Sequence, residues 1–163
     1  MKKEKVINVI RKVVFIVLCI TFLSSLVFLI PCSIKIHKSE KTVDNIKQII
    51  EEIDDKDDDN KKDYSNLYKE NNDFVGWITI KGTNIDYPVM QNKKDEQFYL
   101  HRNFYKEYDF AGTPFCAAIA DVEKSSDNIL IYGHHSNAGT MFTQIEKYED
   151  IDFYKEHKYI KFD

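Results

Sequence analysis

The first pattern along the chain is a long apolar run near the N-terminus. Residues Val13 to Ile30 read VVFIVLCITFLSSLVFLI and contain no charged side chain. A helix of this length is just long enough to cross the roughly 30 Å hydrocarbon layer of a bilayer. We therefore predict a transmembrane helix over residues 13–30.

Apolar residues then recur at helical spacing within a polar segment. Ile46, Ile49, Ile50 and Ile53 lie on one face of a helix, and this predicts a short apolar stripe able to pack on a neighbouring surface. The run Glu51–Asp63 holds eight acidic residues against three lysines, a composition that is usually solvated. Because the run lacks the glycine turn and ligand spacing of an EF-hand loop, we expect no calcium site there.

The remainder of the chain is built from short β-branched and aromatic runs typical of strands. Val75–Ile80 and Ile85–Gln91 are separated by Lys81–Asn84, which has the composition of a turn. Gly112–Ala120 and Asn128–His134 are two further strand candidates, the second a continuous apolar run of the kind found in buried strands.

Helical patterns follow before the sequence returns to a strand. We expect a helix over Thr140–Tyr148, starting near Gly139 or Thr140, and a short helical turn over Asp152–His157. Tyr159–Phe162 then predicts the start of another strand, directly before the last residue of the sequence. The fold class is therefore mainly β with short helices, and we expect a sheet with uncovered edges.

Charge sets the expected orientation in the membrane. The five basic residues ahead of the apolar run are Lys2, Lys3, Lys5, Arg11 and Lys12. Since an excess of Lys and Arg marks the cytoplasmic side, we expect a single-pass plasma-membrane protein with a cytoplasmic N-terminus and an extracellular main domain. The net charge of -4 over the whole chain argues against a nucleic-acid partner, which requires a basic face.

A cleaved signal peptide and a lipid anchor are the alternatives to a membrane span. A signal peptide has an apolar core of roughly 7–15 residues followed by a small-residue cleavage site, which Leu29-Ile30-Pro31-Cys32 does not offer. Pro31 also makes Cys32 a poor lipid acceptor. The chain's three cysteines are too few for a disulfide scaffold, and a pairing of Cys32 with Cys116 stays open.

The candidate chemistry centres on Tyr132-Gly133-His134-His135, directly after the apolar run. A histidine at the end of a buried strand is held rigidly while its ring meets solvent, as a general acid or base requires. Gly133 removes a side chain beside it and is expected to leave room for a substrate backbone. On spacing alone, an ordinary surface or partly buried histidine pair is the more frequent alternative.

Such a histidine usually works with a cysteine or serine nucleophile. Cys116 has apolar neighbours and no cation or helix start close in sequence, so we expect a buried thiol that packs as a small hydrophobic residue. A zinc site from His101, His134 and His135 is a formal option that no metal-ligand spacing supports. We expect no metal and no cofactor.

A series of short motifs, in order and spacing, resembles the N-terminal half of the class B sortases. The motifs are NDFVGWI (72–78), IDYPVMQ (85–91), FYL (98–100), AGT (111–113), YGHH (132–135) and GTMF (139–142). The membrane span and the short acidic segment after it also suit that family. The resemblance divides the chain into a cytoplasmic tip (1–12), a transmembrane helix (13–30), an acidic extracytoplasmic spacer (31–66) and a partial sortase domain (67–163).

The resemblance implies an incomplete sortase-type β-barrel and a transpeptidation reaction. In class B sortases, a cysteine thiolate attacks the Thr carbonyl of a sorting-motif peptide in a secreted protein. A cell-wall peptidoglycan amine then resolves the thioester on the outer face of Gram-positive cells. The family's catalytic histidine maps onto His134, which would protonate the departing amine and later accept a proton from the incoming one. His135 falls on a variable position.

The chain departs from the family in its nucleophile. In class B sortases the cysteine follows a Thr-Leu-x-Thr strand and precedes an arginine that stabilises the oxyanion. Neither segment occurs in this sequence, and Cys116 falls where the family carries a packing residue. We therefore expect a truncated sortase that is inactive as given. The alternative is a non-catalytic, membrane-tethered binding or interaction module.

Overall fold

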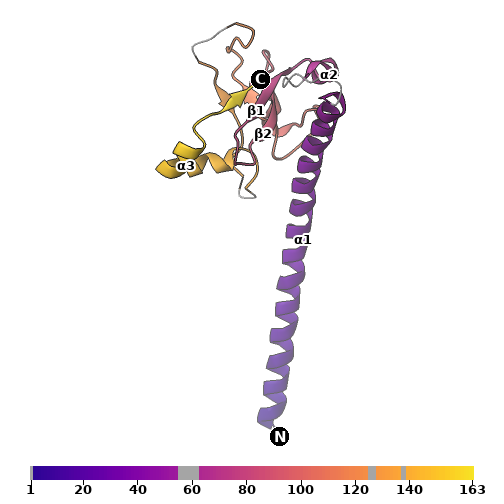
Figure 1. Ribbon diagram of the computed structural model, residues 1–163. Coiled ribbons are helices and arrows are strands. Elements are labelled where there is room, and N and C mark those ends of the chain that lie inside the picture. Colours follow the sequence, from indigo (N-terminus) through magenta and orange to yellow (C-terminus); the bar gives the residue numbers. More distant parts are fainter. Residues whose placement is uncertain (1, 55–62, 125–127, 137–138) are drawn as a thin grey trace. The chain divides into compact units, whose positions relative to one another are not determined.

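The computed structural model describes residues 2–54, 63–124, 128–136 and 139–163. It divides into two compact units, Met1–Lys35 and Ile36–Asp163. The first unit is the N-terminal part of a long helix, α1 (Lys2–Asp54), and the second contains the sheet and the short helices (Figure 1).

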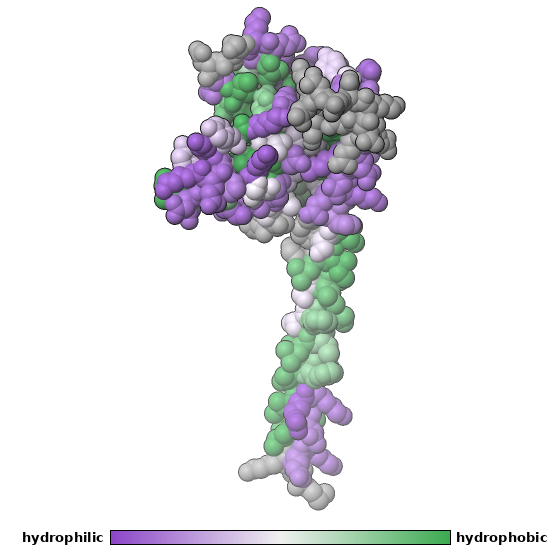
Figure 2. All heavy atoms as spheres, viewed as in Figure 1, coloured by the Kyte–Doolittle hydropathy of each residue, from purple (hydrophilic) through white to green (hydrophobic). Residues whose placement is uncertain are grey.

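The helix of the first unit carries the apolar run. Its side chains over residues 13–30 are largely exposed, and Figure 2 shows them as a green band beyond the purple basic N-terminal end. By length and composition this helix is able to cross a membrane, and a signal sequence near an N-terminus meets the same criterion. The predicted helix is confirmed, and its membrane crossing stays a prediction.

The predicted isoleucine stripe is helical and packs within the second unit. Ile46 and Ile50 are 1% and 3% exposed in a core cluster that also contains Trp77, and Ile49 packs against that cluster. The helical residues 46–50, which the sequence placed in the spacer, thus pack on the sheet domain. Most of the acidic run, residues 55–62, lies outside the described residues, and so does the question of a calcium site there.

The described sheet has five strands in the order β4-β3-β2-β1-β5. The strands are β1 (Phe74–Thr79), β2 (Asp86–Met90), β3 (Phe115–Cys116), β4 (Ile131–Tyr132) and β5 (Lys161–Phe162). β1 and β2, the two predicted strands on either side of the turn, pair as an antiparallel hairpin whose turn contains Gly82 at φ 79°. β5 adds to β1 and β4 to β3, both antiparallel, whereas β2 and β3 are parallel. The mainly β fold is confirmed.

Two of the predicted strands are shorter than expected. Only β3 forms within Gly112–Ala120, and only β4 within Asn128–His134. The prediction that the second run is buried is wrong, because Leu130 is 48% and Tyr132 39% exposed. β4 is an edge strand of the described sheet and has a neighbour on one side only.

The short helices begin close to the predicted positions. The expected helix over Thr140–Tyr148 is a 3-10 helix, η2 (Phe142–Glu149), and α3 (Ile151–Glu156) confirms the predicted helical turn. The side chain of Asp150 caps α3 by accepting from the Asp152 and Phe153 amides. The structure adds two elements that the sequence pattern did not predict, α2 (Ser65–Glu70) and η1 (Phe98–His101).

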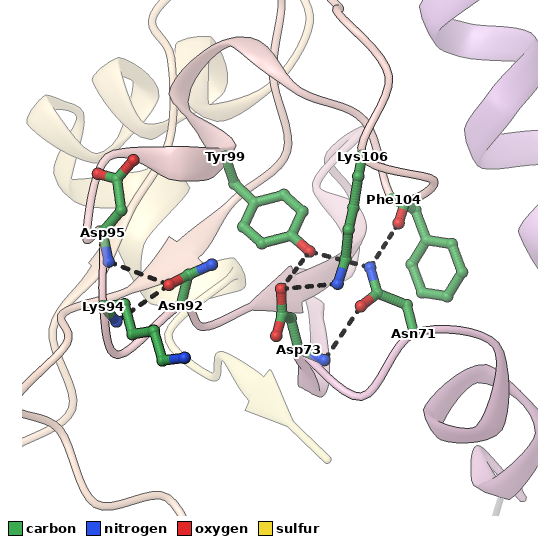
Figure 3. A network of polar contacts seen from close by, with 8 residues as sticks. All are labelled: Asn71, Asp73, Asn92, Lys94, Asp95, Tyr99, Phe104 and Lys106. Atoms are coloured by element: carbon green, nitrogen blue, oxygen red, sulfur yellow. Dashed lines mark hydrogen bonds and ion pairs between the residues drawn. The ribbon is translucent and has the colours of Figure 1, made fainter.

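A buried polar network ties the chain before β1 to η1 (Figure 3). Asn71 donates through Nδ2 to the Tyr99 hydroxyl at 2.9 Å and to the Phe104 carbonyl at 2.6 Å. The Tyr99 hydroxyl donates to Asp73 at 2.8 Å, and Lys106 pairs with the same carboxylate oxygen at 3.2 Å. Burial raises the pKa of Tyr99, so the hydroxyl keeps its proton and remains a donor. The network therefore holds η1 in place through the side chain of Tyr99.

Asp86 links the helix α1 to the β1–β2 hairpin. One carboxylate oxygen accepts from Trp77 Nε1 at 2.7 Å and Thr79 Oγ1 at 3.0 Å, and the other lies 2.8 Å from Lys47 Nζ. Partial burial alone would raise the pKa of Asp86, but the hydrogen bonds from Lys47, Trp77 and Thr79 outweigh it and lower the pKa below 3.8.

We expect Asp86→Asn to destabilise the domain by about 1–2 kcal/mol at pH 7, since solvent screens part of this charged network. A pKa lowered by folding contributes stability that is present above the unfolded-state value and is lost as the pH falls through the folded-state value. The variant and the parent should therefore converge below pH 3.8. Urea unfolding of the full chain in detergent micelles, followed by the fluorescence of Trp77, measures both stabilities.

The surface variant Asp152→Asn is the control for Asp86→Asn, since the side chain of Asp152 is 81% exposed and pairs with the surface residue Lys155, whose side chain is 64% exposed. A stability difference between Asp86→Asn and the parent that stays constant from pH 7 to pH 3 would contradict the assigned role of the carboxylate.

Candidate active site

His134 follows β4, and its half-buried ring is held by a backbone carbonyl. Its Nε2 lies 2.7 Å from the Leu100 oxygen. Because a carbonyl oxygen only accepts hydrogen bonds, this contact requires a proton on Nε2. In the neutral ring, Nδ1 is then the nitrogen that is able to accept a proton. The hydrogen bond thus fixes both the tautomer and the orientation of the ring.

The Leu100 carbonyl is itself held firmly. Leu100 lies in η1 beside Tyr99, whose side chain is fully buried in the polar network and whose carbonyl accepts from the Thr113 amide at 3.1 Å. Gly112 adopts φ 63° and packs against the backbone of Tyr99 and Leu100. A Cβ on Gly112 would lie 2.6 Å from the Tyr99 oxygen. The loop around Gly112 therefore packs on the backbone that carries the Leu100 carbonyl, the hydrogen-bond acceptor of His134.

A row of aromatic rings continues from His134 across the surface. The His101 ring stacks on the His134 ring with centroids 5.2 Å apart and planes at 30°. His101 also contacts Phe110 and Tyr108, at centroid distances of 6.3 and 6.4 Å. Phe110 and Tyr108 are 61% and 67% exposed. Exposed rings beside a candidate acid-base residue offer contact area to an extended ligand such as a peptide.

The three histidines considered from the sequence do not meet at one point. His101 and His134 stack, whereas the exposed His135 lies with its Nε2 2.6 Å from a carboxylate oxygen of Glu146. Within the described part of the chain, no three His, Cys, Asp or Glu side chains are grouped so as to hold a metal ion.

The expected role of Gly133 is wrong in this structure. The space beside Gly133 is filled by the ring of Phe142, and a Cβ on Gly133 would lie 2.6 Å from Phe142 Cδ2. The Phe142 amide also donates to the His134 carbonyl at 3.0 Å. Gly133 thus permits an internal contact that holds the His134 segment, and the space is not open to a substrate backbone.

Cys116 lies in β3 as a free thiol that is fully buried. Burial raises its pKa to about 11, so the nucleophilic thiolate is scarce at neutral pH. The expectation of a packing thiol is confirmed. The side chain of Cys32 lies outside the described residues.

We expect Cys116 to resist alkylation in the folded chain. In a Cys19→Ser, Cys32→Ser double variant, in which Cys116 is the only thiol left, iodoacetamide at pH 8 should react roughly 100-fold more slowly than after unfolding in urea. Mass spectrometry of timed samples measures both rates. Similar rates in the two states would show that Cys116 is accessible and ionised.

Comparison with known proteins places these features in a family. No family model matches the chain. Sortase B of Staphylococcus aureus is 38% identical over 100 residues, which cover 61% of this chain and 41% of that protein. Sortase B of Listeria monocytogenes is 44% identical over 91 residues, which cover 56% of this chain and 37% of that protein. The chain thus spans about two fifths of the length of these curated relatives.

The solved structures agree with the sequence relatives. A Staphylococcus aureus sortase B–substrate complex matches with a TM-score of 0.72 and 30% identity, covering 80% of this chain and 60% of that one. The curled mainly β sheet is therefore part of a sortase fold. These relatives are class B sortases, which confirms, over the part that matches, the resemblance carried by the motifs.

The sequence pattern missed the residues that surround His134. The Leu100 carbonyl and the ring of His101 lie in η1, more than thirty positions away along the chain. The motif FYL ends at Leu100 and the motif AGT contains Gly112, so the resemblance contained the only signal for this neighbourhood.

Proposed function

We propose that this chain provides the histidine-bearing part of a membrane-anchored class B sortase, which attaches secreted proteins to the cell wall through a sorting motif. The observation that carries the proposal is the arrangement at His134. Nε2 donates to the Leu100 carbonyl at 2.7 Å, which leaves Nδ1 for proton transfer, and an exposed aromatic row begins beside the ring.

In the proposed reaction, His134 moves one proton in each half. A cysteine thiolate attacks the Thr carbonyl carbon, the peptide C–N bond breaks, and protonated His134 gives its proton to the departing amine. A peptidoglycan amine then attacks the thioester, the C–S bond breaks, and His134 takes the proton that the new amide loses. The thiolate and the protonated histidine are thereby both regenerated.

The sorting-motif peptide is the proposed first substrate. The sortase B neighbour from Staphylococcus aureus is described as a substrate complex. In this chain the exposed rings of Phe110 and Tyr108 lie next to His101, which stacks on His134. We place the peptide along this aromatic row, because aromatic side chains provide a large contact area at a small cost in side-chain entropy.

The 163 residues alone are proposed to be inactive, because none of the described cysteines suits the reaction. Cys116 is buried with a raised pKa, and Cys19 lies in the apolar helix. In a class B sortase, the nucleophile and the oxyanion arginine would come from the part of the protein that the match does not cover. A thioester trapped on Cys116 by a sorting-motif peptide would refute this.

A chimaera tests the proposed function. It joins residues 1–163 to the part of Listeria monocytogenes sortase B that lies beyond the matched segment. We expect the chimaera to cleave a sorting-motif peptide and transfer it to an amine, and the 163 residues alone to do neither. A folded chimaera with a reactive cysteine that forms no thioester would speak against a sortase active site in this chain.

The proposed location is the plasma membrane of a Gram-positive cell, with the N-terminus in the cytoplasm and residues 67–163 outside. The apolar helix and the basic residues ahead of it support this orientation. Alkaline phosphatase, which is active only outside the cytoplasm, tests it when fused after Asp163. Activity of this fusion is expected, and an inactive but stable fusion would reverse the orientation.

The second candidate function is a non-catalytic, membrane-tethered interaction module. The exposed edge strand β4 favours it, because such an edge is able to pair with another chain. A module of this kind should protect the strand amides around Trp77 and Ile131 from hydrogen exchange without further residues. Protection in the isolated chain, together with an inactive chimaera, would favour this second candidate.

A further inference from the structure

Met141 has a backbone conformation that is rare for a residue with a side chain. It adopts φ 55° and ψ -132°, directly before η2. This region is populated mainly by glycine, and other residues persist there only where their surroundings hold them. The side chain of Met141 is 3% exposed, so the residue is also anchored in the core.

Two residues of the β1–β2 hairpin hold this strained segment. The Met141 amide donates to the hydroxyl of Tyr87, a buried residue of β2, at 3.2 Å. Asn84, in the turn before β2, donates through Nδ2 to the Gly139 carbonyl at 2.6 Å, and its own amide donates to Gln144 at 3.2 Å. These hydrogen bonds with Tyr87 and Asn84, called the clamp below, therefore hold the chain on both sides of Met141.

The clamped segment is in direct contact with the histidine segment. Met141 forms an antiparallel bridge with His135, and the next residue, Phe142, donates its amide to the His134 carbonyl at 3.0 Å. The ring of Phe142 also packs on Gly133. The direction of the Phe142 amide depends on the turn at Met141, so the hairpin residues act on His134 through two successive residues of the chain.

We propose that Tyr87 and Asn84 are positioning residues for His134. The strained turn at Met141 directs the Phe142 amide and ring onto the segment that carries His134, and the two hairpin side chains maintain that turn. Neither residue touches the reacting atoms. The inference rests on the proposed acid-base role of His134 and adds the device that holds its backbone.

The experiment is nuclear magnetic resonance of the full 15N-labelled chain in detergent micelles. Correlation spectra of the imidazole nitrogens report whether His134 keeps its proton on Nε2, and His134→Gln assigns the signals. In Tyr87→Phe we expect the single Nε2-protonated pattern of His134 to become averaged between tautomers. We also expect the Met141 amide to exchange with solvent at least about tenfold faster.

Tyr148→Phe is the matched control, because it removes a hydroxyl that bonds to the His157 carbonyl at 2.5 Å, away from Met141. The Trp77 indole signal reports that each variant is folded. Asn84→Ala, at an exposed position, should change the His134 pattern in the same direction. If Tyr87→Phe does not fold, the His134 pattern of Asn84→Ala tests the proposal in its place.

A His134 pattern unchanged in the folded Tyr87→Phe chain would overturn the proposal, even if the Met141 amide exchanges faster, since Tyr87 would then serve stability alone. These signals do not depend on turnover. An inactive chimaera whose His134 signals depend on Tyr87 would therefore reject the proposed function and leave the clamp standing. An active chimaera whose His134 signals do not depend on Tyr87 would reject the clamp only.

Discussion

His134→Gln is expected to lower kcat/KM of the chimaera for peptide transfer by about 10²–10⁴-fold, the usual contribution of general acid-base catalysis. Glutamine is close to histidine in size and its side-chain amide is able to donate to the Leu100 carbonyl, which accepts from Nε2 at 2.7 Å in the parent. It has no group that titrates near neutral pH. The substitution therefore removes proton transfer with little change in packing.

The neighbouring histidine provides the control for this measurement. His135 pairs with Glu146 at the surface, so His135→Gln should change kcat/KM by less than about threefold. Activity is followed by mass spectrometry of the amine-linked product. Equal losses in the two variants would mean that the segment and not the imidazole of His134 matters, and an unchanged rate in His134→Gln would remove this residue from the mechanism.

The elements that could be predicted from the sequence are those whose signals are local. The β1–β2 hairpin follows from a turn with Gly82 between two β-branched runs, and the isoleucine stripe follows from its helical spacing. Position in the sheet is not local. Periodicity alone reads Ile129–Tyr132 as a buried strand, but exposure depends on the neighbours of β4, and this strand lies at an edge.

The candidate site was predicted only as far as the motifs reached. His134 was predicted as a candidate from its place after a strand and from the resemblance. Its surroundings depend on η1, which lacks a periodic signal, and on the strained turn at Met141, which brings Phe142 onto Gly133. A positive φ at a methionine has no signature in composition. The space beside Gly133 was therefore assigned to a substrate instead of to the ring of Phe142.

The buried network and the site are parts of one arrangement. Asn71 and Asp73 fix the hydroxyl of Tyr99, and the next carbonyl along the chain, that of Leu100, orients His134. A rigid acceptor selects one tautomer and one direction of the ring more sharply than a mobile loop would. The stability of the domain and the geometry of the candidate acid-base group therefore share the same supports, and a substitution behind η1 should affect both.

Gly112→Ala is expected to be the most damaging of the substitutions for the fold, with a loss of roughly 3 kcal/mol or more. Gly112 has φ 63°, where a side chain is strained, and the added Cβ would lie 2.6 Å from the Tyr99 oxygen and close to the Leu100 oxygen. These neighbours are backbone atoms, so the clash cannot be relieved by a change of rotamer. The Leu100 carbonyl should be displaced, and the imidazole signals of His134 should change with it.

Gly139→Ala separates the two causes of this loss. Gly139 has φ 77°, but a Cβ there would have no atom of the described residues within 4 Å, so the backbone strain is the expected cost, about 1 kcal/mol. Urea unfolding followed by Trp77 fluorescence compares the two variants on the full chain. If both alanine substitutions lower the free energy of unfolding by the same amount, the close approach of Gly112 to η1 does not contribute to the loss. A loss at Gly112 that leaves the His134 signals unchanged would break the link between that loop and the site.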